Sequence, residues 1–247
     1  VVVKKIIPDP QISRFHSDTE VAAIRFRDVL HDGELLRLNY GIFALHATLM
    51  ALWLVVPLTL REAGMEANDH WQIYLPVLLL SVVCIIPAII YAEKKAKLKP
   101  VFIAAIAILL LGQILLAITA DSITATAIAL WVFFTAFNLL EASLPSLISK
   151  IAPVGAKGTA IGIYSSTQFL GAFAGASIGG YLFGNFGSQS LYSFCGLLLA
   201  VWLVLAITMK TPAAVRSKMY SVQAMDFIGG LFCGADLGAG QRPRTSR

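Results

Sequence analysis

The chain has 247 residues, of which 57% are hydrophobic and 13% are charged. Soluble globular domains carry about 25% charged residues, so this composition argues against a soluble fold and indicates that lipid is the main solvent. The formal net charge of +5 comes from basic residues placed between long apolar runs. That pattern is typical of membrane-flanking loops, so we expect no nucleic-acid partner.

Residues 1–37 precede the first long apolar run and are predicted to form a cytoplasmic N-terminal segment. Ser17 and Glu20 have the spacing of a capping box, in which each side chain satisfies a backbone N–H at the start of a helix. The apolar Ile24 and Val29 then share the segment with basic residues, which predicts a short amphipathic helix lying on the membrane surface. A solvated linker helix without membrane contact explains the same pattern.

The central part of the chain is dominated by apolar runs. A membrane-spanning helix needs about 20 consecutive, mostly apolar residues. Six segments meet this requirement: 38–60, 73–92, 100–120, 123–149, 158–184 and 189–209. We therefore predict an all-α membrane protein whose residues 38–210 form a six-transmembrane-helix bundle.

The first of these segments contains His46. Ionisable side chains inside a span are rare, and they often mark a proton or substrate pathway. His46 is therefore a candidate for such a pathway. The alternative is a structural histidine that hydrogen-bonds to a neighbouring helix.

A basic loop, YAEKKAKLKP, joins the second and third segments at residues 91–100. By itself it is explained by the excess of Lys and Arg in cytoplasmic loops. Its acidic Glu93 is followed directly by Lys94 and Lys95.

The fourth segment carries a carboxylate, Glu141, with Asn138 three residues earlier on the same helical face. A charged side chain at the centre of a span costs about 2.5–3.5 kcal/mol on insertion scales, so Glu141 is expected to face the protein interior or water. A buried carboxyl group can exchange a proton near neutral pH. Glu141 and Asn138 are thus candidates for a proton or substrate pathway, and a structural carboxylate bonded to other helices is the alternative.

The fifth segment combines polar and small residues. Tyr164 and Gln168 are further candidates for lining a substrate or proton pathway. Gly171, Gly175 and Gly179 lie four residues apart and form one stripe along a helix. Because lipid tails are as apolar as leucine, small residues that let two backbones approach drive helix association in membranes. The stripe therefore predicts a helix-packing surface.

The tail, residues 211–247, differs from the apolar part of the chain. It ends in a glycine-rich, basic stretch without helical or strand periodicity, so we expect a cytoplasmic tail that is disordered or not native to the protein. The chain begins at Val1, not at a methionine, and we expect it to be a fragment.

The basic residues predict the orientation. If the six segments alternate in direction, one side of the membrane receives only Arg61, and the other receives twelve basic residues: Arg25, Arg27, Arg37, Lys94, Lys95, Lys97, Lys99, Lys150, Lys157, Lys210, Arg216 and Lys218. Cytoplasmic loops carry such an excess, so both termini are predicted to be cytoplasmic.

Known catalytic motifs are absent from the sequence. There is no GxSxG, HExxH, Walker A or GxGxxG pattern, and the four histidines are scattered. We therefore expect no enzyme activity, no cofactor and no metal site.

Three stretches together resemble the C-terminal six-helix half of a major facilitator superfamily transporter: residues 137–180, the opening of the first span at 34–57, and the loop at 91–100. The resemblance covers residues 35–210 and implies half of a major facilitator fold, in which two six-helix halves rock around a site at the membrane midplane. It also implies that Glu93, with Lys94 and Lys95, forms a charge network that latches one conformation.

The resemblance implies membrane transport by a secondary, proton-coupled efflux transporter (an antiporter) for small molecules in the cell inner membrane. The expected partners are the lipid bilayer, a small-molecule substrate, and either the missing N-terminal six-helix half or a second copy of the chain. Three alternatives stay open: a half-size six-helix protein acting as a homodimer, a membrane-embedded enzyme, and a nonfunctional remnant of a broken gene.

Overall fold

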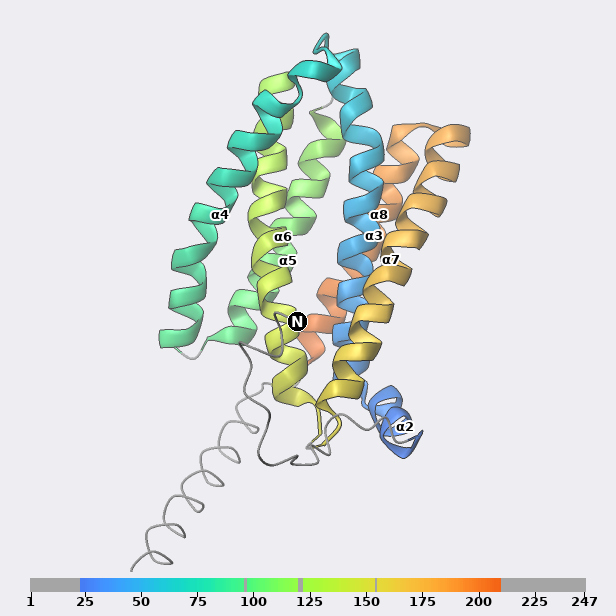
Figure 1. Cartoon of the computed structure of the whole chain (residues 1–247). Helices are drawn as coiled ribbons and strands as arrows, with labels where there is room; N and C mark the ends of the chain where they lie inside the picture. The colour runs from blue at the N-terminus through green and yellow to red at the C-terminus, as the bar shows by residue number, and fades with distance from the viewer. Residues whose placement is uncertain (1–22, 96, 120–121, 154, 210–247) are drawn as a thin grey trace, which may run out of the picture. The chain divides into compact units, whose positions relative to one another are not determined.

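The computed structural model describes residues 23–95, 97–119, 122–153 and 155–209 (Figure 1). All regular structure in these residues is helical. A short helix α2 (Ala23–His31) precedes six long ones: α3 (Gly33–Glu62), α4 (Trp71–Lys94), α5 (Leu98–Ile118), α6 (Ile123–Ile151), α7 (Lys157–Phe186) and α8 (Ser188–Thr208). One 3-10 turn, η2 (Ala67–Asp69), joins α3 to α4. The predicted all-helical bundle is confirmed, and each long helix overlaps one of the six predicted spans.

Five of the long helices in the described part of the chain, α3, α4, α5, α6 and α8, are long and apolar enough to cross a membrane. The exception is α7. It is a continuous helix of 30 residues, but glycines and hydroxyl-bearing side chains lower the apolarity of its sequence. The fifth predicted span, 158–184, is therefore present as a helix of sufficient length, although its most apolar stretch is less apolar than those of the other five.

The structure covers only part of the predicted N-terminal segment and none of the predicted tail. Ser17, Glu20 and the tail at 211–247 lie outside the described residues. The short helix α2 ends at His31, and α3 begins directly after Asp32. The Asp32 carboxylate caps α3 by accepting hydrogen bonds from the backbone N–H groups of Glu34 (2.8 Å) and Leu35 (3.1 Å). The first long helix therefore starts before the predicted span, in the segment assigned to the N-terminus.

Helix α3 occupies the middle of the bundle. It contacts α6, α7 and α8, whereas α4 lies at one edge and packs mainly on α6 (Figure 1). Small residues set the close contacts: Gly41 of α3 faces the buried Trp202 of α8, and Gly112 of α5 faces the backbone of Phe133 in α6. A short reversal at Gly187, whose φ is 79°, connects α7 to α8.

The bundle has one strongly basic end. The starts of α3, α5 and α7 and the ends of α4, α6 and α8 lie at this end, together with most of the described lysines. We call it the basic end. Two of its cations hold the last turn of α8: Lys99 Nζ donates to the carbonyl oxygens of Ile207 (3.2 Å) and Met209, and Arg37 Nη1 donates to that of Thr208 (3.5 Å). Cations at this position complement the negative end of the helix dipole.

Candidate functional site

The glycine stripe of α7 lies directly against α3. A Cβ atom added to Gly171 would meet the backbone of Phe43, and one added to Gly175 would meet the backbone of Ala47. At Gly179 an added Cβ would lie 3.3 Å from the Ala51 side chain. All three glycines are buried. The two backbones therefore approach as closely as the absence of side chains allows, and this brings polar groups of α3 and α7 within reach of each other.

One such polar contact joins His46 of α3 to Gln168 of α7. The Gln168 Nε2 atom lies 2.8 Å from His46 Nε2, and His46 Nδ1 lies 3.3 Å from the carbonyl oxygen of Ile42 in its own helix. The His46 side chain is 11% exposed. Two residues that the sequence could propose only separately therefore form an interhelical pair.

With the Gln168 amide oriented so that its nitrogen faces the ring, the hydrogen bonds assign the proton of His46 to one ring nitrogen. An amide nitrogen only donates, so His46 Nε2 must accept the bond from Gln168 and is unprotonated. The proton then resides on Nδ1, where it is donated to the Ile42 carbonyl oxygen. His46 is thus a neutral imidazole held at both nitrogens, and protonation of Nε2 would remove the acceptor that Gln168 uses.

Glu141 of α6 is the third member of this cluster. Its Oε2 atom lies 3.9 Å from His46 Nε2, which is too long for a hydrogen bond and close enough for electrostatic attraction to a charged imidazole. The Glu141 side chain is 36% exposed, yet Oε2 is buried and has no hydrogen-bond partner among the described residues. A carboxylate oxygen in this state is poised to take a proton or a polar ligand.

Tyr164 of α7 completes the polar group. It is 5% exposed, and its hydroxyl group has no hydrogen-bond partner in the described part of the chain. It is close enough to Glu141 to interact with it electrostatically. We call His46, Gln168, Glu141 and Tyr164 the polar junction. It joins α3, α6 and α7 inside a largely apolar bundle.

An aromatic wall borders the polar junction. The Phe137 ring of α6 lies 6.0 Å from the His46 ring, centroid to centroid, and further ring contacts lead through Phe134 to Trp53. Apolar walls around polar groups limit access of water and strengthen electrostatic interactions between them. Phe137 was not predicted as a site residue. Its position four residues before Glu141 could have revealed it, because residues four apart share one face of a helix.

Asn138 does not join the polar junction. Its Nδ2 atom donates to Ser81 Oγ of α4 at 2.8 Å, and Ser81 Oγ in turn donates to the Leu78 carbonyl oxygen at 2.7 Å. Asn138 therefore connects α6 to α4, although it is on the same helix as Glu141. Ser81 was not predicted, and the signal that could have revealed it is a single hydroxyl in the otherwise apolar middle of α4.

The basic loop has a different pattern from the polar junction. Glu93 belongs to the last turn of α4, and its side chain lies outside what the structure describes. Lys94 and Lys95 are exposed, and neither side chain has an ion-pair or hydrogen-bond partner among the described residues. Within the described residues, the loop is instead connected to another helix by Lys99, whose side chain donates hydrogen bonds to the end of α8.

Comparison with known proteins places these features in a family. The sequence profile of the Major Facilitator Superfamily matches residues 38–223. The chain is 39% identical over 219 residues to the inner membrane transport protein YajR of Escherichia coli (strain K12), which covers 89% of this chain and 48% of YajR.

Two further relatives are uncharacterized transporters of Buchnera aphidicola. One, from the subspecies of Acyrthosiphon pisum, is 31% identical over 56% of this chain and 36% of its own length. The other, from the subspecies of Baizongia pistaciae, is 29% identical over 74% of this chain and 47% of its own length. The chain spans about half the length or less of these curated relatives. The match across all six long helices shows that this chain is a membrane protein of the Major Facilitator Superfamily and is similar to YajR.

Proposed function

We propose that this chain forms the C-terminal six-helix half of a proton-coupled secondary transporter that exports small molecules across the inner membrane. The observation that carries the proposal is the polar junction, in which Glu141 Oε2 lies 3.9 Å from His46 Nε2 inside the bundle. Ionisable pairs within membrane-spanning segments mark proton relays and substrate pathways. Membership of a transporter family supports the same assignment.

The hydrogen bonds of the polar junction support proton coupling. When His46 is neutral, its Nε2 atom accepts from Gln168 and ties α3 to α7. A proton on Nε2 turns this atom into a donor, which repels the amide N–H and is attracted to the Glu141 carboxylate on α6. Uptake of a proton therefore ends the contact between α3 and α7 in this form, so that the Gln168 amide must turn its oxygen toward the ring to keep it, and adds an attraction between α3 and α6. A change of this kind lets proton binding favour one arrangement of the helices over another.

If the chain is half of a transporter, it needs a second six-helix unit as its partner. Transporters of this architecture bind substrate between two six-helix halves, and one half alone cannot enclose such a site. The extent of the match, 48% of YajR, supports pairing with an N-terminal six-helix half. A second copy of this chain is the other arrangement that would complete a cavity. In either case the basic end faces the cytoplasm, because Lys and Arg are enriched on that side.

The test of proton coupling uses the protein at its full natural length, reconstituted in vesicles containing a trapped pH indicator. A panel of fluorescent small molecules supplies the substrates, and the Glu141→Gln variant keeps the shape of the side chain while removing its proton exchange. We expect proton-driven uptake of at least one compound, and we expect Glu141→Gln to abolish its coupling to the pH gradient while exchange of that compound without a gradient persists. The matched control is Glu62→Gln, an exposed carboxylate at the far end of α3.

Two results contradict the proposal. Unchanged proton coupling in Glu141→Gln removes the assigned role of this residue. Failure of the wild-type protein to move protons or any compound of the panel contradicts transport by proton exchange. Mass measurement before and after chemical cross-linking distinguishes the partners. A second copy of the chain doubles the mass on cross-linking, whereas an N-terminal half either belongs to the same polypeptide or adds a different mass.

A further inference from the structure

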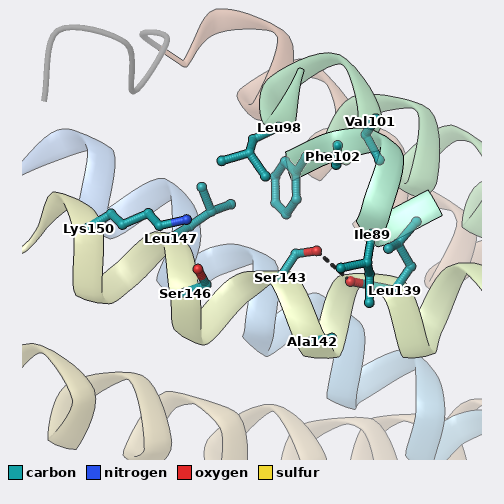
Figure 2. Close-up of a pocket in the computed structure, with 11 residues that line it drawn as sticks. Ile89, Leu98, Val101, Phe102, Leu139, Ala142, Ser143, Ser146, Leu147 and Lys150 are labelled. Atoms are coloured by element: carbon teal, nitrogen blue, oxygen red, sulfur yellow. Dashed lines mark hydrogen bonds between the residues drawn. The ribbon is translucent and has the colours of Figure 1, made fainter. Parts of the chain in front are cut away.

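A pocket opens at the basic end of the bundle, between α4, α5 and α6 (Figure 2). It lies on a different face of α6 from Glu141. Its walls come from Ile89 of α4, Phe102 of α5, and Leu139 and Leu147 of α6. The space exists because α6 presents small residues there, such as Ala142, which leave room between the larger side chains of the three helices.

The polar groups of the pocket are confined to α6. The Ser143 hydroxyl donates to the Leu139 carbonyl oxygen at 2.6 Å and is thus already engaged within its helix. Ser146 and Lys150 follow at one-turn intervals and are exposed. Figure 2 shows the Lys150 side chain extending back along α6 toward Leu147. Neither Ser146 nor Lys150 has a side-chain hydrogen bond or an ion pair with another described residue, so both are available to a ligand.

The surroundings of the pocket are positively charged. Lys94, Lys95 and Lys97, in the connection from α4 to α5, are exposed near the same end of the helices. Among the acidic residues described at this end, Glu34 forms an ion pair with Arg37 at 2.6 Å. Asp32 is engaged as the cap of α3, and the exposed Asp28 lies on α2, which does not line the pocket. The described charges therefore favour an anion at the mouth of the pocket.

We propose that this pocket binds an anionic phospholipid from the surrounding membrane leaflet. One acyl chain occupies the space between Ile89, Phe102 and Leu147, and the phosphate group lies at Lys150 and Ser146. Basic pockets between transmembrane helices bind anionic headgroups, and long basic side chains reach toward the headgroup region while their stems stay in apolar surroundings. A free phosphate ion would match Lys150 and Ser146 and would leave the apolar walls without a partner. The proposal does not depend on transport.

The test measures lipid retained by the purified full chain. The chain is loaded in detergent with phosphatidylglycerol or with zwitterionic phosphatidylcholine, and bound lipid is counted by native mass spectrometry. We expect preferential retention of phosphatidylglycerol. The Lys150→Glu variant should lower it by about fivefold or more, since one basic side chain contributes about that factor to attraction of an anionic lipid. Lys157→Glu makes the same charge change at the basic end outside the pocket and should have little effect.

A second pair of variants tests the acyl-chain position. Ala142→Leu fills the pocket without changing charge, and Ser146→Leu does the same from the next turn, so that one variant remains informative if the other fails to fold. Circular dichroism and size-exclusion chromatography identify the folded variants. We expect every folded one to lose retained phosphatidylglycerol.

Three outcomes overturn the proposal. Equal losses in Lys150→Glu and Lys157→Glu indicate diffuse charge attraction to the basic end. Full retention in folded pocket-filling variants shows that no acyl chain occupies the space. Displacement of the lipid by an excess of inorganic phosphate, with no dependence on the acyl chain, identifies a phosphate site in place of a phospholipid site.

Discussion

Helices α4 and α7 fit into the bundle in opposite ways. Within the most apolar stretch of the α4 span only 11% of residues are buried, and large side chains such as Leu79 and Val83 are more than half exposed. Helix α7 is less apolar than the five span-like helices, yet it lies along α3 with its glycines against the α3 backbone. In lipid, apolar side chains are solvated as well by the bilayer as by protein. Apolarity therefore does not determine which helix is buried, whereas small and polar residues do.

The largest expected effect on stability comes from a side chain that forces α3 and α7 apart. Gly175→Leu places a side chain where the Ala47 backbone lies, and neither helix can yield without losing neighbouring contacts. We expect a loss of about 3 kcal/mol or more in unfolding free energy, because overpacking against backbone is not relieved by side-chain rotation. Denaturant titration in detergent measures it. Gly184→Leu is the control, since an added Cβ there meets nothing within 4 Å. Because leucine is a better helix former than glycine, equal losses at both positions would show that contact with the α3 backbone does not set the cost.

The polar contact across the same interface is expected to have a smaller effect. A double-mutant cycle with His46→Ala and Gln168→Ala isolates their coupling, which we expect to be about 0.6 kcal/mol and at most about 1.7 kcal/mol. The same cycle with Thr167→Ala in place of Gln168→Ala should give no coupling, because the Thr167 hydroxyl donates to the Ile163 carbonyl oxygen within α7 and bonds to no other described residue. A coupling indistinguishable from zero for His46 and Gln168 would contradict the pair.

At the edge of the bundle, a single polar contact connects α4 to α6. Asn138→Leu removes the hydrogen bond to Ser81, and we expect a loss of about 0.6 kcal/mol, typical of side-chain hydrogen bonds between membrane helices. Adding Ser81→Ala to Asn138→Leu should cost little more, because the shared bond is already gone. Additive losses in unfolding free energy from the two substitutions would show that the residues act independently.

The smallest expected effect is on the lipid-facing side of α4. Leu79 is 61% exposed, so Leu79→Ala should change the unfolding free energy by less than about 0.5 kcal/mol. Leu140→Ala removes the same atoms from a fully buried position in α6 and should cost clearly more, because it leaves a cavity. A large loss for Leu79→Ala would mean that α4 is covered by protein at this face, for example by a second six-helix half.

The fold was predictable from the sequence because bilayer thickness leaves little choice. Runs of about 20 apolar residues must become helices, since lipid cannot hydrogen-bond an open backbone. The six helices, their order and their ends to within a few residues follow from this. The sequence spacing of Gly171, Gly175 and Gly179 likewise predicted that one face of α7 would be smooth, without indicating which helix lies against it.

The candidate site was predictable only as separate residues. His46, Gln168, Glu141 and Tyr164 were each selectable as polar groups in apolar helices, but Asn138 was grouped with Glu141 and instead bonds to Ser81. A helix that is apolar on all sides, such as α4, carries no periodic signal of the face it presents to its neighbours. Its rotation is decided by contacts with other helices.

By itself, the sequence determined that this protein is a helical membrane bundle with one basic end, because burial in lipid constrains each segment locally. Only the tertiary structure decided that α3 lies against the glycines of α7 and that His46, Gln168 and Glu141 meet. The contact between His46 and Gln168 alone joins residues 122 positions apart. They depend on the rotation and spacing of three helices at once, which no single segment encodes.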